Sequence, residues 1–203
     1  MKRFKFAAVM IVLAAVVLVI GLVMKNQADF AHDNVRQQLA QQGIVFQQVS
    51  DLMPNQKTIP CLVANAGKPL VTGVQAECYA DDQIQPDLAA IFGTKTYADL
   101  SAPARGAAQA AAIMAAKDPS NPQLPALQAA AAQAEAPAFV AFQAQSLRGM
   151  LLTTYAFDHM GDLGGATATA LFIGAAVLFL IGIALGGIAG RKPNVTPASE
   201  PLS

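Results

Sequence analysis

A long, uncharged apolar segment constrains this chain more than any other feature of its sequence. Residues 166–190 read ATATALFIGAAVLFLIGIALGGIAG, without charge or proline. As a helix, this segment is long enough to cross a lipid bilayer, which takes about 20 apolar residues. A second apolar segment, residues 7–24, lies near the other end of the sequence. The sequence therefore predicts an all-α membrane protein in which two transmembrane helices flank one helical extracytoplasmic domain.

Basic residues at the ends of the two apolar segments predict the orientation of the chain. Lys2, Arg3 and Lys5 precede the first segment. Its apolar part is longer than that of a secretory signal peptide and no small-residue cleavage site follows it, which favours an uncleaved anchor. Arg191 and Lys192 follow the second segment. The positive-inside rule then places both termini in the cytoplasm, and we expect a two-pass plasma-membrane protein.

The predicted organisation has five parts. They are a cytoplasmic N-terminus (1–6), a transmembrane helix (7–24), an extracytoplasmic helical domain (25–165), a second transmembrane helix (166–190) and a disordered cytoplasmic tail (191–203). The first helix is expected to continue beyond the membrane and to end at Gly43, because glycine readily adopts the left-handed conformation that closes a helix.

Local patterns inside the middle domain predict several further helices. Thr72 and Thr96 are expected to begin helices, because a threonine hydroxyl can accept a hydrogen bond from the amide three residues later. The alanine-rich stretches 104–117 and 124–136 predict helices, since alanine is the best helix former. A flexible linker is the alternative for these stretches. Another helix is expected over 138–160, with a kink at the glycines that precede the second membrane segment.

The two cysteines of the chain, Cys61 and Cys78, both fall in the middle domain. An oxidising compartment would let them pair, and closing this loop would stabilise the fold by about 3 kcal/mol on the chain-entropy model. The alternative is a pair of free, buried thiols. Two cysteines without neighbouring histidines fall short of a zinc shell, so neither a metal nor another cofactor is predicted.

Small residues recur at regular spacing in each apolar segment. They are Gly174, Gly182, Gly186 and Gly190 in the second segment, and Ala7, Ala14 and Gly21 in the first. Small side chains let two helices approach closely in lipid, where packing drives association. We therefore predict helix contacts at these residues, either between the two segments or with a partner subunit. The alternative is that the pattern is chance, because glycine is common in membrane helices.

The two histidines of the chain stand near the ends of the apolar segments. His32 follows the first segment and His159 precedes the second, and four aspartates flank them: Asp29, Asp33, Asp158 and Asp162. If these side chains converged, they could bind a metal ion or relay protons. Separate, solvated residues at the membrane surface are the favoured interpretation.

No residue pattern in the sequence indicates an enzyme. Serine nucleophile elbows, phosphate-binding glycine loops and H-E-x-x-H are absent from the sequence, and neither apolar segment contains the charged residue that marks an ion pathway. The net charge of zero argues against a nucleic-acid partner. The expected partners are membrane lipid and other membrane-protein subunits or a second copy.

The sequence therefore favours a non-catalytic accessory or scaffolding subunit of a plasma-membrane assembly, such as an envelope or respiratory complex. An extracytoplasmic lipid-binding or small-ligand-binding and sensing module, anchored by two spans, is the alternative. Loosely packed alanine-rich helices can leave apolar grooves of the kind that such ligands occupy.

Four stretches of the sequence resemble a family of small actinobacterial two-span membrane proteins. They are QQLAQQGIVF, GKPLVTGVQAECYADDQI, GTKTYADLS and SLRGMLLTTYAF. The resemblance covers most of the chain outside the alanine-rich part and implies two spans with a helical outer domain. The family is sometimes labelled a ring-opening dioxygenase, but such chemistry needs iron ligands, which two distant histidines do not supply. The resemblance transfers no functional residues.

Overall fold

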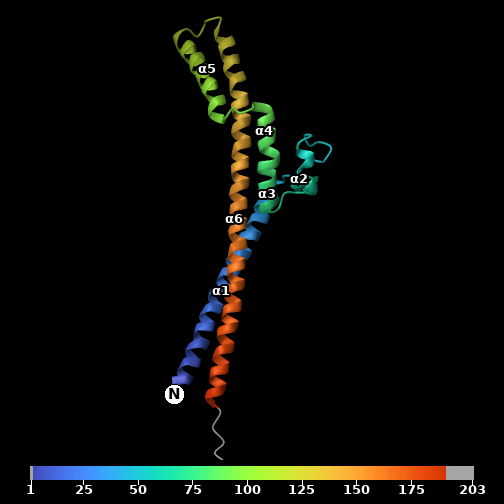
Figure 1. Cartoon of the computed structure of the whole chain (residues 1–203). Helices are drawn as coiled ribbons and strands as arrows, with labels where there is room; N and C mark the ends of the chain where they lie inside the picture. The colour runs from blue at the N-terminus through green and yellow to red at the C-terminus, as the bar shows by residue number, and fades with distance from the viewer. Residues whose placement is uncertain (1, 191–203) are drawn as a thin grey trace, which may run out of the picture. The chain divides into compact units, whose positions relative to one another are not determined.

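The structure, a computed structural model, describes residues 2–190, and all its regular elements are helical (Figure 1). In chain order they are α1 (Lys2–Gln42), the 3₁₀ turn η1 (Gln56–Thr58), α2 (Pro60–Asn65), α3 (Gly73–Cys78), the π-helix η2 (Tyr79–Ile84), α4 (Gln85–Phe92), α5 (Tyr97–Lys117) and α6 (Leu124–Gly190). Within the described residues, β pairing is limited to one isolated bridge, Val45 with Pro69. The predicted all-helical fold is confirmed, and α1 and α6 are long and apolar enough to cross a membrane.

The chain divides into two compact units. Within the described residues, unit 1 consists of residues 2–31 with 160–190, and unit 2 of His32–His159. Helices α1 and α6 each contribute residues to both units. Unit 2 falls within residues 25–165, the predicted central domain. The predicted disordered tail, residues 191–203, lies outside the described residues.

In unit 1, α1 and α6 pack side by side in antiparallel orientation (Figure 1). One small buried residue recurs every seven positions on each helix: Ala7, Ala14, Gly21 and Ala28 on α1, and Ala168, Ala175 and Gly182 on α6. A repeat of seven keeps one seam of a helix facing its neighbour. Because the residues on this seam are small, the two backbones approach closely.

In unit 2, the core gathers apolar side chains from nearly every element. Its members are Val35, Leu39, Phe46, Leu52, Leu62, Leu70, Ala76, Cys78, Ala80, Ile84, Leu88 and Leu151. Burying one leucine side chain stabilises a fold by about 1.5–3 kcal/mol. The irregular segment between α1 and α3 supplies several of these side chains, and their burial helps to hold it against the helices.

Three helix boundaries lie where the local sequence predicts them. Helix α1 ends at Gln42, and Gly43 follows with φ 64°. Helices α3 and α5 begin after Thr72 and Thr96, and each threonine accepts a hydrogen bond in a complete capping box. These boundaries depend on hydrogen bonds within a few residues of chain, which is why the sequence reveals them.

Other predicted boundaries are wrong, because two prolines lie inside helices. Helix α5 joins the helix expected after Thr96 to the alanine-rich stretch 104–117 and runs through Pro103. Helix α6 likewise joins the stretches 124–136 and 138–160 and runs through Pro137 as one helix rather than as two. The helix also includes Gly164 and Gly165, and the kink expected there stays a prediction. An interior proline destabilises a helix by about 3 kcal/mol. The many alanines on both sides of each proline favour the helical state and offset this loss. The alanine-rich stretches are thus helices rather than linkers.

The sequence did not predict the π-helix η2. Ala76, Ala80, Ile84 and Leu88 are buried and recur every four residues through this region. In an α-helix of 3.6 residues per turn, such a row drifts by about 40° per step. The wider π turn, with its hydrogen bonds to the fifth residue, reduces this drift and keeps the row directed at the core.

Candidate functional site

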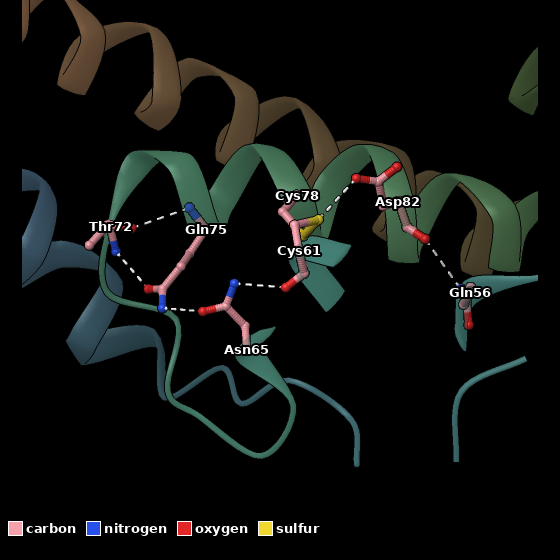
Figure 2. The surroundings of a disulfide bond; sticks show 7 residues. All are labelled: Gln56, Cys61, Asn65, Thr72, Gln75, Cys78 and Asp82. Atoms are coloured by element: carbon pink, nitrogen blue, oxygen red, sulfur yellow. Dashed lines mark hydrogen bonds between the residues drawn. A yellow bond between two sulfur atoms is a disulfide. The ribbon is translucent and has the colours of Figure 1, made fainter. Parts of the chain in front are cut away.

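The expected disulfide joins the second residue of α2 to the last residue of α3. Cys61 and Cys78 are bonded with their Cα atoms 6.2 Å apart (Figure 2). Cys78 is buried, whereas Cys61 is only half-buried. The two residues of this bond therefore differ in their exposure to solvent.

A chain of side-chain amides runs beside the disulfide and joins the same two helices (Figure 2). Asn65 Nδ2 donates to the carbonyl of Cys61 at 2.8 Å, and Gln75 Nε2 donates to Asn65 Oδ1 at 2.9 Å. Gln75 Oε1 accepts from the backbone amides of Val71 and Thr72 at 2.8 and 3.1 Å. Helix α2 is thus held to the start of α3 by hydrogen bonds as well as by the disulfide.

The π-helix places an acidic side chain directly against the disulfide. Asp82 Oδ2 lies 3.1 Å from Cys61 Sγ (Figure 2). A disulfide sulfur carries no proton, so the carboxylate receives no hydrogen bond from it while the bond is intact. The contact therefore puts a negative charge beside the sulfur of the more exposed cysteine. Single π turns often occur at functional sites, and the position of Asp82 depends on this one.

A fully buried glutamine fixes the π turn from the other side. Gln56 Nε2 donates to Asp87 Oδ1 at 3.0 Å and to the carbonyls of Asp82 and Gln83 at 3.4 Å each. Its Oε1 accepts from the amide of Met53 at 3.0 Å. A buried amide needs such partners, because an unpaired polar group inside a protein costs about 1–3 kcal/mol. Gln56 thereby ties η1 to η2 and α4.

Tyr79, the first residue of η2, packs edge-on against Phe46 with ring centroids 5.2 Å apart. Partial burial raises the pKa of the Tyr79 hydroxyl, and the nearby carboxylate of Asp87 raises it further. Both effects disfavour the tyrosinate form. Tyr79 therefore acts here as a neutral packing group.

Cys61, Cys78 and Asp82 form the one group among the described residues whose potential metal ligands converge, with ligand atoms within 4.8 Å of one another. The cysteine species that binds metal is the thiolate. In the disulfide neither sulfur is a thiolate, so this arrangement does not hold a metal ion in the oxidised protein.

A second polar cluster of unit 2 contains one of the two histidines. His32 Nδ1 lies 2.7 Å from Asp158 Oδ1, and the backbone amide of Gly73 donates to Asp158 Oδ2 at 3.0 Å. The expectation of separate, solvated residues is wrong for His32 and Asp158. The second histidine, His159, instead stacks on Tyr155 with ring centroids 6.0 Å apart. The two histidines thus have different partners.

The small residues predicted to make helix contacts occupy different environments in unit 1. Ala7 and Ala14 are each 4% exposed. A Cβ atom added to Gly21 would lie 2.8 Å from the ring of Phe172, and one added to Gly182 would lie 2.8 Å from Ile11 Cγ1. At these two glycines a larger side chain has no room.

The other glycines of the predicted row differ from Gly182. A Cβ atom on Gly186 would make an ordinary contact of 3.9 Å with Ala7, whereas one on Gly174 would meet nothing within 4 Å. The surroundings of Gly190 lie outside the described residues. Sequence reasoning missed Ala168 and Ala175, which are buried. Ala168 and Ala175 precede Gly182 at steps of seven residues, the same spacing as that of Ala7, Ala14 and Gly21, and this spacing is the signal that could have found them.

No family model, curated protein or solved structure matches this chain. The resemblance to small actinobacterial membrane proteins remains a prediction.

Proposed function

We propose that this protein is a non-catalytic accessory or scaffolding subunit of a plasma-membrane assembly, such as an envelope or respiratory complex. The observation that carries the proposal is the exposed apolar surface of α1 and α6. In the most apolar window of each helix, only 17% of the residues are buried inside the structure. The core helix of a soluble protein would be mostly buried, whereas a membrane-spanning helix turns such a surface to lipid or to a partner.

A groove between α1 and α6 offers a place for a partner helix. It has a volume of about 360 Å³ and is lined by Ile11, Ala14, Ala15, Leu18, Phe172, Ala175, Ala176 and Phe179. Two of the lining alanines, Ala14 and Ala175, are buried, whereas the larger side chains of Ile11, Leu18 and Phe179 are exposed. Close approach over small residues is how transmembrane helices associate, so we propose that an apolar helix of another subunit occupies this groove.

Filling the groove tests this proposal. Ala176→Leu places a larger side chain in the groove, whereas Val177→Leu alters the adjacent exposed position, which does not line it. The wild type, purified in mild detergent and analysed by mass spectrometry, should carry a stoichiometric membrane partner. Ala176→Leu should lose that partner and Val177→Leu should retain it. Lipid alone, a second copy alone, or equal retention by both variants would count against the proposal.

The proposed orientation places both termini in the cytoplasm and the central domain outside. Basic residues flank the apolar segments on the proposed inner side, and a disulfide persists best in an oxidising compartment. Labelling of one introduced cysteine at a time from outside intact cells, with Cys61 and Cys78 held in their disulfide, tests the orientation. Lys117→Cys should react and Ser203→Cys should not, and the reverse pattern would refute it.

A groove in unit 2 favours ligand binding as a second candidate function. It lies between α5 and α6, has a volume of about 330 Å³, and is lined by Tyr97, Ser101, Ala104, Arg105, Ala108, Glu135, Ala138, Phe139 and Phe142. Tyr97 and Phe142 lie side by side with ring centroids 5.6 Å apart. Aromatic walls with a few polar groups are typical of ligand sites. Lipid that co-purifies with the wild type but not with Phe139→Ala would support this function, and equal retention by both would oppose it.

A further inference from the structure

The two cysteines of the disulfide differ in their exposure to solvent. Cys78 is 5% exposed and Cys61 is only half-buried. Thiol–disulfide exchange begins when a thiolate attacks a disulfide sulfur, and access decides which sulfur it attacks. We propose that Cys61 Sγ is the site of thiol–disulfide exchange in this protein, and that Asp82 beside it selects thiols by charge and rejects anionic ones.

The selection follows from the charge that lies against the reactive atom. Asp82 Oδ2 is 3.1 Å from Cys61 Sγ (Figure 2). The neighbouring Asp81 is instead paired with Arg148 at 2.7 Å, and Asp87 accepts a hydrogen bond from Gln56. An incoming thiolate is negative and must approach the Asp82 carboxylate. Repulsion between like charges at contact distance therefore slows the attack, more so if the thiol carries further negative charge.

The exchange can be written as two balanced steps. A thiolate attacks Cys61 Sγ, the bond to Cys78 breaks, and Cys78 leaves as a thiolate that takes a proton from solvent. Cys61 is then joined to the reagent in a mixed disulfide. A second thiolate attacks the reagent's sulfur, releases Cys61, which is protonated, and forms the oxidised reagent. Two electrons pass from the two thiols to the protein disulfide.

Rates of reduction by three thiols of different charge test the proposal on the full-length protein in uncharged detergent. The attacking forms of mercaptoethanesulfonate, mercaptoethanol and cysteamine carry two, one and no net negative charges. For each thiol the rate of Asp82→Asn is divided by the wild-type rate, which cancels the intrinsic reactivity of the thiol. This ratio should be near one for cysteamine and should rise about fivefold or more with each added negative charge. Added salt should shrink the differences in the wild type.

Glu77→Gln is the matched control, because it removes a carboxylate one residue before Cys78 that is not part of the group of side chains converging at the disulfide. Its rate ratios should stay nearly equal for the three thiols. Acid-quenched mixed disulfides should carry the reagent on Cys61, as located by fragment mass spectrometry. Equal rate ratios for Asp82→Asn across the three thiols, or adducts mainly on Cys78, would overturn the proposal. Circular dichroism of Asp82→Asn identifies any variant that fails to fold, and the salt series on the wild type then decides the question by itself.

Discussion

Asp158 Oδ1 lies 2.7 Å from Nδ1 of His32, across 126 residues of chain, and its second carboxylate oxygen accepts the amide hydrogen of Gly73. One carboxylate therefore joins α1, the start of α3 and α6 within unit 2. The Asp158 side chain is only 14% exposed. Its removal would leave a backbone amide and an imidazole nitrogen without their partner in a partly buried place.

Asp158→Ala should destabilise unit 2 by about 1.5–3 kcal/mol, the usual contribution of hydrogen bonds to a charged group. Hydrogen exchange at residues 73–78 should become faster, since the first turn of α3 loses its contact with α6. Asp33→Ala is the matched control. Asp33 is 78% exposed and pairs with Arg36 at 3.9 Å, and such exposed pairs contribute little. Unchanged exchange in α3 of Asp158→Ala would contradict the prediction.

Gly182→Ile and Gly174→Ile should differ sharply, although both place the same side chain in the same helix. At Gly182 a Cβ atom would lie 2.8 Å from Ile11, whereas at Gly174 it would meet nothing within 4 Å. Overpacking typically costs about 1–3 kcal/mol, so Gly182→Ile should weaken the pairing of α1 and α6 by that amount. Gly174→Ile should be nearly neutral. Unfolding of each purified variant by a denaturing detergent measures its loss of stability. Equal losses for Gly182→Ile and Gly174→Ile would show that the close approach at Gly182 is unimportant.

Replacing Cys61 and Cys78 together by alanine should lower the free energy of unfolding of unit 2 by about 3 kcal/mol, because the bridge closes a loop with a sequence separation of 17. Helix α2 should open first, although its amide contacts to α3 remain. Chemical denaturation monitored by circular dichroism measures the loss. Titration of the denatured, unreduced wild type should find no free thiol, and recovery of both thiols would reject the bridge.

Alkaline conditions should destabilise unit 2 through Tyr79. Burial, followed by the charge of Asp87, raises the pKa of Tyr79 above its usual 10.0. Because the folded-state pKa is raised, the stabilising contribution is complete below pH 10.0 and is lost as the pH rises from there through the folded-state value. Tyr79→Phe keeps the ring against Phe46 and should remove this part of the pH dependence. The free energy of unfolding of the wild type and of Tyr79→Phe, measured from neutral to alkaline pH, tests this. Parallel plots of that free energy against pH for the two proteins would contradict the prediction.

Features that depend on a few neighbouring residues were readable from the sequence. The end of α1 before Gly43 and the starts of α3 and α5 after Thr72 and Thr96 are examples, since each uses hydrogen bonds that span only a few residues. The two apolar segments were equally plain, because length and composition alone meet the requirement for a span. The predicted break between helices at Pro137 was wrong, because α6 continues through this residue. The preference of proline for helix ends is a local rule, and it takes no account of the helix-forming residues on both sides.

The sequence by itself determined that this chain is helical, carries two apolar segments and holds two cysteines close enough along the chain to pair. The tertiary structure alone decided which groups meet: Asp158 with His32, Asp82 with the Cys61 sulfur, and Gly182 rather than Gly174 with α1. The physical reason is that these contacts depend on the rotation of each helix about its axis and on the register between neighbouring helices. A helical pattern states which residues share a face, but the π turn at Tyr79–Ile84 shifts those faces, and the meeting of two distant helices depends on the packing of the whole core.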